Sequence, residues 1–157
     1  MVHLHTTRFA VRSYEVDSYR HLNNAVYVSW LEHARLLYLQ SLGFSYDGFA
    51  DRQQWLVVAR TEVDFRAPLH VGDEVESRTW IEALGRSSLR FRHVLRRVPA
   101  GAAVPGSAVG EPVCTALTVM AFSGPDGRSR PIPEDVRAAV GPPGNPPEAE
   151  AVAPRAR

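Results

Sequence analysis

The chain has 157 residues, the size of one ordinary domain, and it is long enough to bury a core without disulfides. Its 18 basic and 17 acidic residues leave a formal charge of +1, so charge predicts neither a nucleic-acid nor a membrane partner. The single cysteine, Cys114, excludes an internal disulfide and a cysteine-based zinc site. The first residues lack the pattern of a signal peptide, and the apolar runs are too short to span a membrane, so we expect a cytoplasmic protein.

The first third of the chain predicts a strand, a polar segment and a long helix. Residues 7–16 alternate between apolar and polar side chains, which is typical of a strand. Residues 17–25 are polar and turn-like. Apolar residues then recur at helical spacing from about Val26 to Leu42, and Gly43 can end that helix. A loop over residues 44–53 is expected to follow.

Four more strands are predicted, at residues 54–66, 74–83, 87–98 and 112–123. The last is a nearly continuous apolar run, which indicates a central strand buried on both faces, with Cys114 as a buried core thiol. Short connections among the four favour a largely antiparallel meander.

Two segments stand apart from these elements by composition. Residues 99–110 are rich in Pro, Ala and Gly and predict a long hairpin loop. From Gly141 onward the chain holds five prolines and few bulky apolar residues. We therefore predict one domain over residues 1–140 and a disordered tail over 141–157.

One amphipathic helix can cover only one face of a five-stranded sheet. The second face then needs another partner, because a sheet with exposed apolar residues tends to associate. The pattern therefore predicts a homo-oligomer.

Chemistry-bearing side chains gather just before the predicted helix. Asp17, His21, Asn23 and Asn24 fall within eight residues, next to a helix N-terminus whose unpaired N–H groups suit a developing oxyanion. A carboxylate placed there can attack a carbonyl or activate water. The same residue types also make ordinary turns and helix caps, and residue chemistry alone favours that second interpretation.

A family resemblance reverses this preference. The pattern Asp17-x-x-x-His21-x-Asn23-Asn24-x-x-Tyr27, followed by the run 30–35, resembles the signature of hotdog-fold thioesterases. It is similar to the 4-hydroxybenzoyl-CoA thioesterase-like branch and to plant acyl-carrier-protein thioesterases. Later stretches that match lie at residues 57–65, 72–75 and 84–88, so the resemblance covers about residues 7–140.

The resemblance implies an α+β hotdog fold, in which a five-stranded, mainly antiparallel sheet wraps one long helix and active sites lie between two subunits. Asp17 corresponds to the catalytic aspartate, acting as nucleophile or as general base. Asn24 corresponds to the residue whose backbone N–H meets the thioester carbonyl, while His21 and Asn23 match motif positions that orient these groups. One position departs from the plant enzymes, because Tyr19 stands where they carry Asn.

Further positions are weaker candidates. The expected substrate-binding residues are Tyr19, Tyr27, Arg60, Arg86 and Ser87. Arg86 is the best candidate for a CoA phosphate because it lies in a glycine turn with free backbone N–H groups.

Glu32 is a reserve catalytic carboxylate, although a pair with Arg35 on the same helix is the simpler interpretation. The six histidines lack metal-ligand spacing, so we expect no metal and no cofactor.

The sequence therefore predicts a thioesterase that cleaves an acyl-CoA or an acyl-carrier-protein substrate to a free acid and a thiol. Two alternatives stay open. One is a hotdog hydratase or dehydratase that acts on enoyl thioesters. The other is a non-catalytic acyl-CoA-binding protein.

Overall fold

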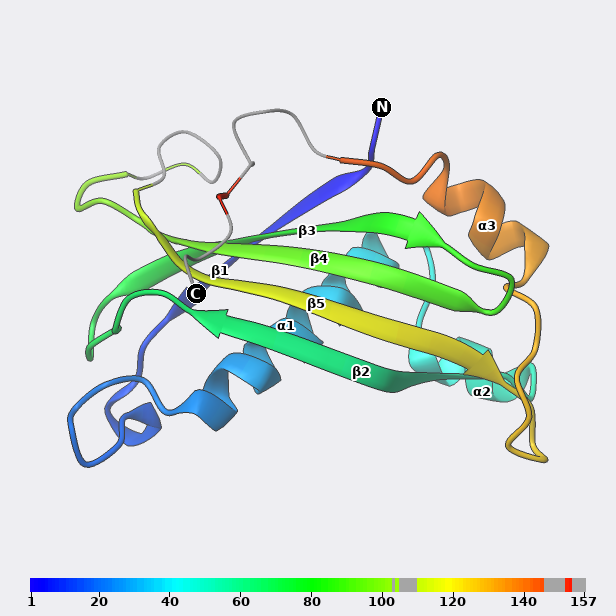
Figure 1. Ribbon diagram of the computed structural model, residues 1–157, viewed down its shortest axis with the longest axis horizontal. Helices are drawn as coiled ribbons and strands as arrows, with labels where there is room; N and C mark the ends of the chain where they lie inside the picture. The colour runs from blue at the N-terminus through cyan, green and yellow to red at the C-terminus, as the bar shows by residue number, and fades with distance from the viewer. Residues whose placement is uncertain (103, 105–109, 146–151, 154–157) are drawn as a thin grey trace.

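The computed structural model describes residues 1–102, 104, 110–145 and 152–153. Its strands are β1 (Leu4–Ala10), β2 (Trp55–Phe65), β3 (Glu74–Leu84), β4 (Ser88–Arg97) and β5 (Pro112–Ser123). Its helices are α1 (Asn24–Ser41), α2 (Tyr46–Asp51) and α3 (Glu134–Val140), and a short 3-10 turn covers Ser13–Glu15. The strands form one sheet, with α1 crossing behind it and α2 and α3 near one end (Figure 1). The α+β arrangement expected from the sequence is confirmed.

The strand order is β1-β3-β4-β5-β2, and every neighbouring pair is antiparallel. Strands β3, β4 and β5 form the expected meander, but the expectation that β2 also belongs to it is wrong. β2 pairs with β5 at the far edge, although only residues 66–73 join it to β3. Eight residues reach up to about 26 Å, whereas three strand spacings require only about 14 Å. A short connection therefore does not force β2 and β3 to be neighbours.

One strand boundary and two short helices differ from the sequence prediction. β1 ends at Ala10 instead of residue 16, because Ala10 pairs with Glu74 and Glu74 is the first residue of β3. The predicted loop 44–53 contains α2, whose N-terminus is capped by Ser45 accepting a hydrogen bond from the Gly48 N–H at 3.0 Å. Helix α3 was not predicted.

Helix α1 confirms the predicted long helix and supplies the main packing surface. Tyr27, Leu31 and Leu39 lie at helical spacing on the face that is buried against the sheet. The helix ends before Gly43, whose φ of 88° is a left-handed conformation that glycine adopts without strain. The position of α1 on the sheet is thus fixed along its whole length.

The core under α1 consists of two apolar clusters, one containing Tyr27 and Leu31 and the other containing Leu39. Buried Arg35 lies one helical turn from Leu31 and one from Leu39. It donates a hydrogen bond to Thr118 at 3.1 Å. A polar layer therefore crosses the core where the two clusters meet.

His93 belongs to the same layer and is fully buried on β4. Its Nδ1 is 3.0 Å from the Thr79 hydroxyl, and its Nε2 has no hydrogen-bond partner among the described residues. Burial lowers the pKa of His93 well below its ordinary value, and the cations of Arg35 and Arg92 lower it further. The imidazole is therefore neutral in the folded protein.

Strand β5 only partly matches its prediction. Cys114 is a buried thiol, as expected, and burial raises its pKa to about 12. However, buried and half-buried residues alternate along β5, so the strand is not buried on both faces of the single chain. The reason is that α1 covers only one face of the sheet.

The two segments of unusual composition lie partly outside the described residues. The connection 98–111 joins the antiparallel pair β4 and β5, as predicted, but residues 103 and 105–109 are not described. Of the predicted tail 141–157, residues 146–151 and 154–157 are not described. Among the described residues, no helix is both long and apolar enough to cross a membrane.

The neutral, buried His93 predicts a loss of stability in mild acid. In the unfolded chain the imidazole titrates near 6.5, so below that pH the unfolded state binds a proton that the folded state does not. The free energy of unfolding should fall by up to about 1.4 kcal/mol per pH unit below pH 6.5. Urea unfolding at several pH values measures this slope. It should become shallower in a His93→Gln variant but not in a His33→Gln control.

Candidate active site

The residues before α1 form a tight loop that is closed by its own backbone. Val16 and Leu22 form an antiparallel bridge, and the Asp17 N–H donates to the His21 carbonyl at 2.8 Å. Arg20 takes a φ of 63° to complete the turn. These contacts hold Asp17 and His21 next to each other at the base of the loop.

The Asp17 carboxylate is fixed by backbone donors on one side only. Its Oδ1 accepts hydrogen bonds from the N–H groups of Tyr19 at 2.9 Å and His21 at 3.2 Å. Its Oδ2 has no hydrogen bond to the residues that the structure describes. One oxygen therefore orients the carboxylate while the other is available for chemistry.

The N-terminus of α1 follows directly. The Asn23 side chain caps the helix by accepting a hydrogen bond from the Ala25 N–H at 2.9 Å. Asn24 is the first helical residue, and its N–H has no acceptor within the described part of the chain. The positive end of the helix dipole adds to this free donor, so the position suits an anionic oxygen.

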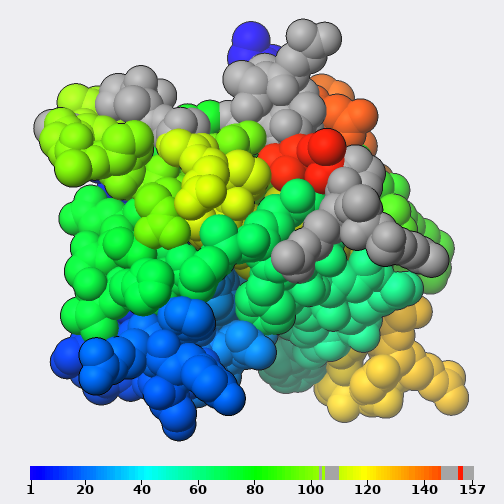
Figure 2. Space-filling view, turned by 60° about the vertical axis from the view of Figure 1, so that its left-hand side comes forward, coloured from blue at the N-terminus to red at the C-terminus, as the bar shows by residue number. Residues whose placement is uncertain are grey.

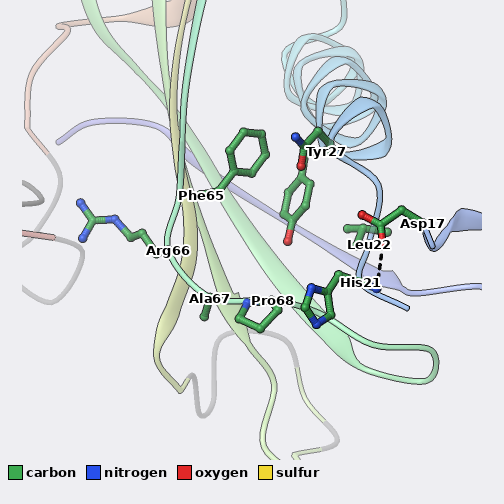
Figure 3. Close-up of a pocket in the computed structure, with 9 residues that line it drawn as sticks. Asp17, His21, Leu22, Tyr27, Phe65, Arg66, Ala67 and Pro68 are labelled. Carbon is green, nitrogen blue, oxygen red and sulfur yellow. Dashed lines mark hydrogen bonds between the residues drawn. The ribbon is translucent and has the colours of Figure 1, made fainter. Parts of the chain in front are cut away.

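A cavity of about 290 Å³ brings these groups together. Its lining residues are Asp17, His21, Leu22, Asn24, Tyr27, Phe65, Arg66, Ala67 and Pro68. Figure 3 shows Asp17 and His21 on one side and the end of β2 on the other, with the Tyr27 ring projecting from α1 between them. Figure 2 shows the same end of the molecule, where the blue segment before α1 lies against green residues that follow β2.

Two aromatic rings form the apolar part of the cavity wall. The Tyr27 ring meets the Phe65 ring edge-on, with centroids 5.1 Å apart. Burial raises the pKa of Tyr27 to about 12, so its hydroxyl stays protonated at neutral pH. The wall thus offers an apolar surface and one neutral hydroxyl beside the carboxylate.

The structure brings together four of the predicted site residues and separates the others. Asp17, His21, Asn24 and Tyr27 line the cavity. The predicted residues that do not line it are Tyr19, Asn23, Arg60, Arg86 and Ser87. Tyr19 is 82% exposed and contributes its backbone N–H to Asp17, while Asn23 acts as the helix cap.

The predicted arginines lie away from the cavity. Arg60 forms an ion pair with Glu62 on exposed β2. Arg86 and Ser87 form the turn between β3 and β4, whereas the cavity adjoins the opposite end of these strands. β3 spans 11 residues, which corresponds to roughly 36 Å of strand.

Two further predictions concerned α1. Arg35 is buried in the core, where it contacts Thr118, while Glu32 is exposed and does not line the cavity. The charge of Glu32 still acts on the Arg35 guanidinium. Among the described residues, no group of three or more His, Cys, Asp or Glu side chains is placed to hold a metal ion.

Sequence reasoning missed the cavity wall that faces Asp17, which is built by Phe65, Arg66, Ala67 and Pro68. These residues lie more than 40 positions after Asp17. The only local signal was Pro68, which marks the end of a strand but does not indicate where the strand leads.

Comparison with known proteins identifies relatives of this chain. The sequence profile of the thioesterase-like superfamily matches residues 11–140. The dodecanoyl-[acyl-carrier-protein] hydrolase of Cinnamomum camphora is 32% identical over 140 residues, which cover 85% of this chain and 35% of that one. The long-chain acyl-CoA thioesterase FadM of Escherichia coli is 29% identical over 107 residues, which cover 62% of this chain and 74% of FadM.

A solved structure of similar size also belongs to a thioesterase. A thioesterase from Thermus thermophilus, crystallised with coenzyme A and zinc, is 35% identical and superposes with a TM-score of 0.68, covering 86% of this chain and 90% of that one. This match confirms the hotdog fold. The chain spans about half or less of the chloroplastic relatives that it matches.

The Asn23 cap should stabilise the folded protein through a single side-chain oxygen. Asn23→Ala removes the acceptor for the Ala25 N–H and should lower the free energy of unfolding by about 1 kcal/mol. Asn23→Ser keeps a capping oxygen and should retain most of the stability. Denaturant unfolding of the two variants measures the difference. Equal stabilities would show that the cap contributes nothing.

Proposed function

The chain belongs to the thioesterase-like superfamily, and on that premise we propose that it hydrolyses an acyl thioester to a carboxylic acid and a thiol. One observation carries the proposal. A carboxylate with one uncommitted oxygen, on Asp17, and a helix N-terminus with an unpaired N–H, on Asn24, line the same cavity. Acyl transfer needs both parts, a group that attacks or activates the attacker and a donor for the oxyanion.

Asp17 serves this reaction in one of two ways. As a nucleophile, its free oxygen bonds to the thioester carbon, the thiolate leaves, and water then cleaves the mixed anhydride. As a general base, Asp17 takes a proton from a water molecule while the oxygen of that water bonds to the thioester carbon; the C–S bond then breaks, and the departing thiolate takes up a proton to give the free thiol. In both routes His21 and Asn23 keep Asp17 and the helix terminus in place.

The oxyanion forms next to the start of α1. The Asn24 N–H donates to it, and the positive end of the helix dipole stabilises its charge. Asn23 supports this role because its cap occupies the Ala25 N–H and leaves the Asn24 N–H free. Tyr27 contributes a protonated hydroxyl at the same wall.

The thiol carrier is CoA or an acyl-carrier protein, since relatives act on one or the other. Tyr27 is the substrate-binding residue in the cavity wall, while the exposed Tyr19 ring would contact substrate outside the cavity, next to Asp17. Arg60, Arg86 and Ser87 would have to come from a second copy of the chain, because in one chain they do not line the cavity. We place the protein in the cytoplasm.

A second copy is the partner that we propose, as a dimer or as a tetramer built from dimers. β2 is an 11-residue edge strand and carries the exposed apolar side chains Trp55, Val57 and Val58. A long apolar edge of this kind tends to pair with another strand. The end of β2, at Phe65, is also cavity wall, so pairing along this edge places the cavity beside the subunit interface.

The role of Asp17 predicts a loss of turnover without loss of fold. Asp17→Asn keeps an oxygen for the Tyr19 and His21 N–H groups but loses the charge, so kcat should fall by about 100- to 10,000-fold. Thiol release from short, medium, long and aromatic acyl-CoA substrates measures it. Asp51→Asn, an exposed carboxylate on α2, is the matched control.

The outcomes of this experiment separate the alternatives. Full activity in a folded Asp17→Asn protein would contradict the assignment of Asp17. Water addition to an enoyl-CoA without thiol release would instead indicate the hydratase. Tight acyl-CoA binding without any product would indicate a binding protein.

The proposed pairing of two chains along β2 predicts that a substitution in this strand changes the mass of the assembly. Val58→Arg places a charge in the apolar part of β2 and should shift the protein from dimer or tetramer toward monomer in sedimentation experiments. Val71→Arg, at a comparably exposed valine outside the strands, should leave the mass unchanged. A monomeric wild-type protein at micromolar concentration, or an unaffected Val58→Arg assembly, would rule out this interface.

A further inference from the structure

The cavity wall facing Asp17 belongs to a segment without regular secondary structure. Residues 66–73 join β2 to β3 and carry Ala67 and Pro68 into the wall. Pro68 is exposed and has no N–H, so its carbonyl is its only backbone hydrogen-bonding group. The N–H groups of Arg66 and Ala67 hold the start of the segment to the Val113 carbonyl, so at Pro68 only the carbonyl is left to bind a further support.

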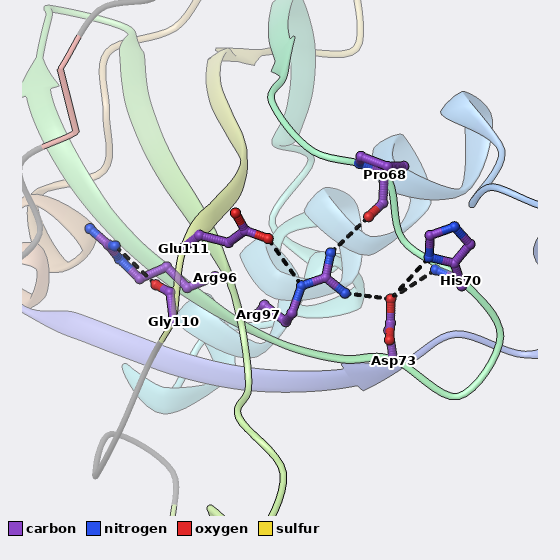
Figure 4. A network of polar contacts seen from close by, with 7 residues as sticks. All are labelled: Pro68, His70, Asp73, Arg96, Arg97, Gly110 and Glu111. Carbon is purple, nitrogen blue, oxygen red and sulfur yellow. Dashed lines mark hydrogen bonds and ion pairs between the residues drawn. The ribbon is translucent and has the colours of Figure 1, made fainter.

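Arg97, the last residue of β4, provides that contact (Figure 4). Its Nη2 donates to the Pro68 carbonyl at 2.8 Å, and its Nη1 donates to the Asp73 carboxylate. Its Nε donates to Glu111 at 3.3 Å. One planar guanidinium thus ties both ends of the 68–73 turn to Glu111, the residue before β5, a geometry that a lysine ammonium cannot reproduce.

A first route connects this turn to Asp17 through the backbone. Leu69 follows Pro68 and is fully buried, and its carbonyl accepts a hydrogen bond from the Leu22 N–H at 2.8 Å. Leu22 also forms the bridge that closes the Asp17 loop. Displacement of Pro68 therefore displaces the closing residue of that loop.

A second route runs through two imidazoles. The His70 ring lies edge-on to the His21 ring with centroids 5.1 Å apart. The backbone N–H of His70 donates to Asp73 Oδ2 at 2.9 Å, the oxygen that Arg97 also holds. Although burial alone would raise the pKa of Asp73, the His70 N–H and Arg97 outweigh it and lower that pKa. Asp73 is therefore charged, and its pair with Arg97 is fully formed, at neutral pH.

We propose that Arg97 is a positioning residue of the proposed thioesterase site, which acts through Pro68, Asp73 and Leu69 to hold Asp17 and His21 against the cavity. The inference rests on the proposed function for its effect on turnover. It does not rest on that function for its effect on the order of the loop. Arg97 does not line the cavity, so it touches neither the proposed substrate nor the reacting atoms.

The test combines amide hydrogen exchange with steady-state kinetics on the full chain. In Arg97→Gln, the N–H groups of Leu22 and His21 should exchange about tenfold faster or more, since the loop opens locally. With the acyl-CoA substrate that the wild type cleaves best, kcat should fall about tenfold while KM changes less than about threefold. Arg97→Lys should give an intermediate kcat, because an ammonium keeps the charge but not the three-way contact.

Arg92 provides a matched control on the same strand. Its guanidinium pairs with Glu82 at 2.9 and 3.0 Å, and the two side chains are 34% and 24% exposed. The Arg97–Asp73 pair is similarly placed, at 29% and 28%. Arg92→Gln should therefore cost comparable stability, yet leave the exchange of the Leu22 N–H and the value of kcat within about twofold of wild type.

Each outcome decides the proposal. Unchanged exchange at Leu22 and His21 in Arg97→Gln, or an equal increase in Arg92→Gln, overturns it. Faster exchange with unchanged kcat also overturns it, because the loop order would then not matter for turnover. If the wild type cleaves no thioester, the proposed function fails, and the exchange data still decide whether Arg97 orders the loop.

Discussion

The packing of α1 on the inner face of the sheet is the constraint on which the site depends. Tyr27 and Leu31 are buried in the cluster nearest the cavity, and their burial fixes where the helix begins. Burial of each such side chain contributes about 1.5–3 kcal/mol, more than a single hydrogen bond in the exposed loop. The free N–H of Asn24 is therefore placed by the core, and the Asp17 loop has only to meet it.

The parts of the site that are close in sequence could be predicted from the sequence. Asp17, His21 and Asn24 lie within eight residues, and local backbone contacts plus one helix cap bring them to one cavity. The helix itself was predictable because its buried face repeats at helical spacing. For these residues, sequence separation is a good guide to distance in space.

The parts that depend on strand order could not be predicted. The wall at Phe65 and Pro68 faces Asp17 only because β2 pairs with β5 at the far edge, and the alternation along β2 is the same for either neighbour. The burial of Arg35 was similarly hidden, because a charged residue on a helix acquires its burial from tertiary packing, which leaves no mark in the local pattern. His93 differs. It lies in step with Phe91 and Leu95 along β4, and that alternation predicts a core or cavity-lining histidine.

Asp17 is exposed in a single chain, so the proposed reaction depends on the proposed assembly. An exposed carboxylate is hydrated, and both nucleophilic attack and proton abstraction gain from replacing that water with fixed donors. Tyr19 and His21 supply two such donors to Oδ1, but Oδ2 receives no hydrogen bond from the described part of the chain. A second copy paired along β2 would lie beside the Phe65 wall and close the open side of the cavity. Loss of the proposed dimer should therefore lower turnover even where every residue of the Asp17 loop is intact.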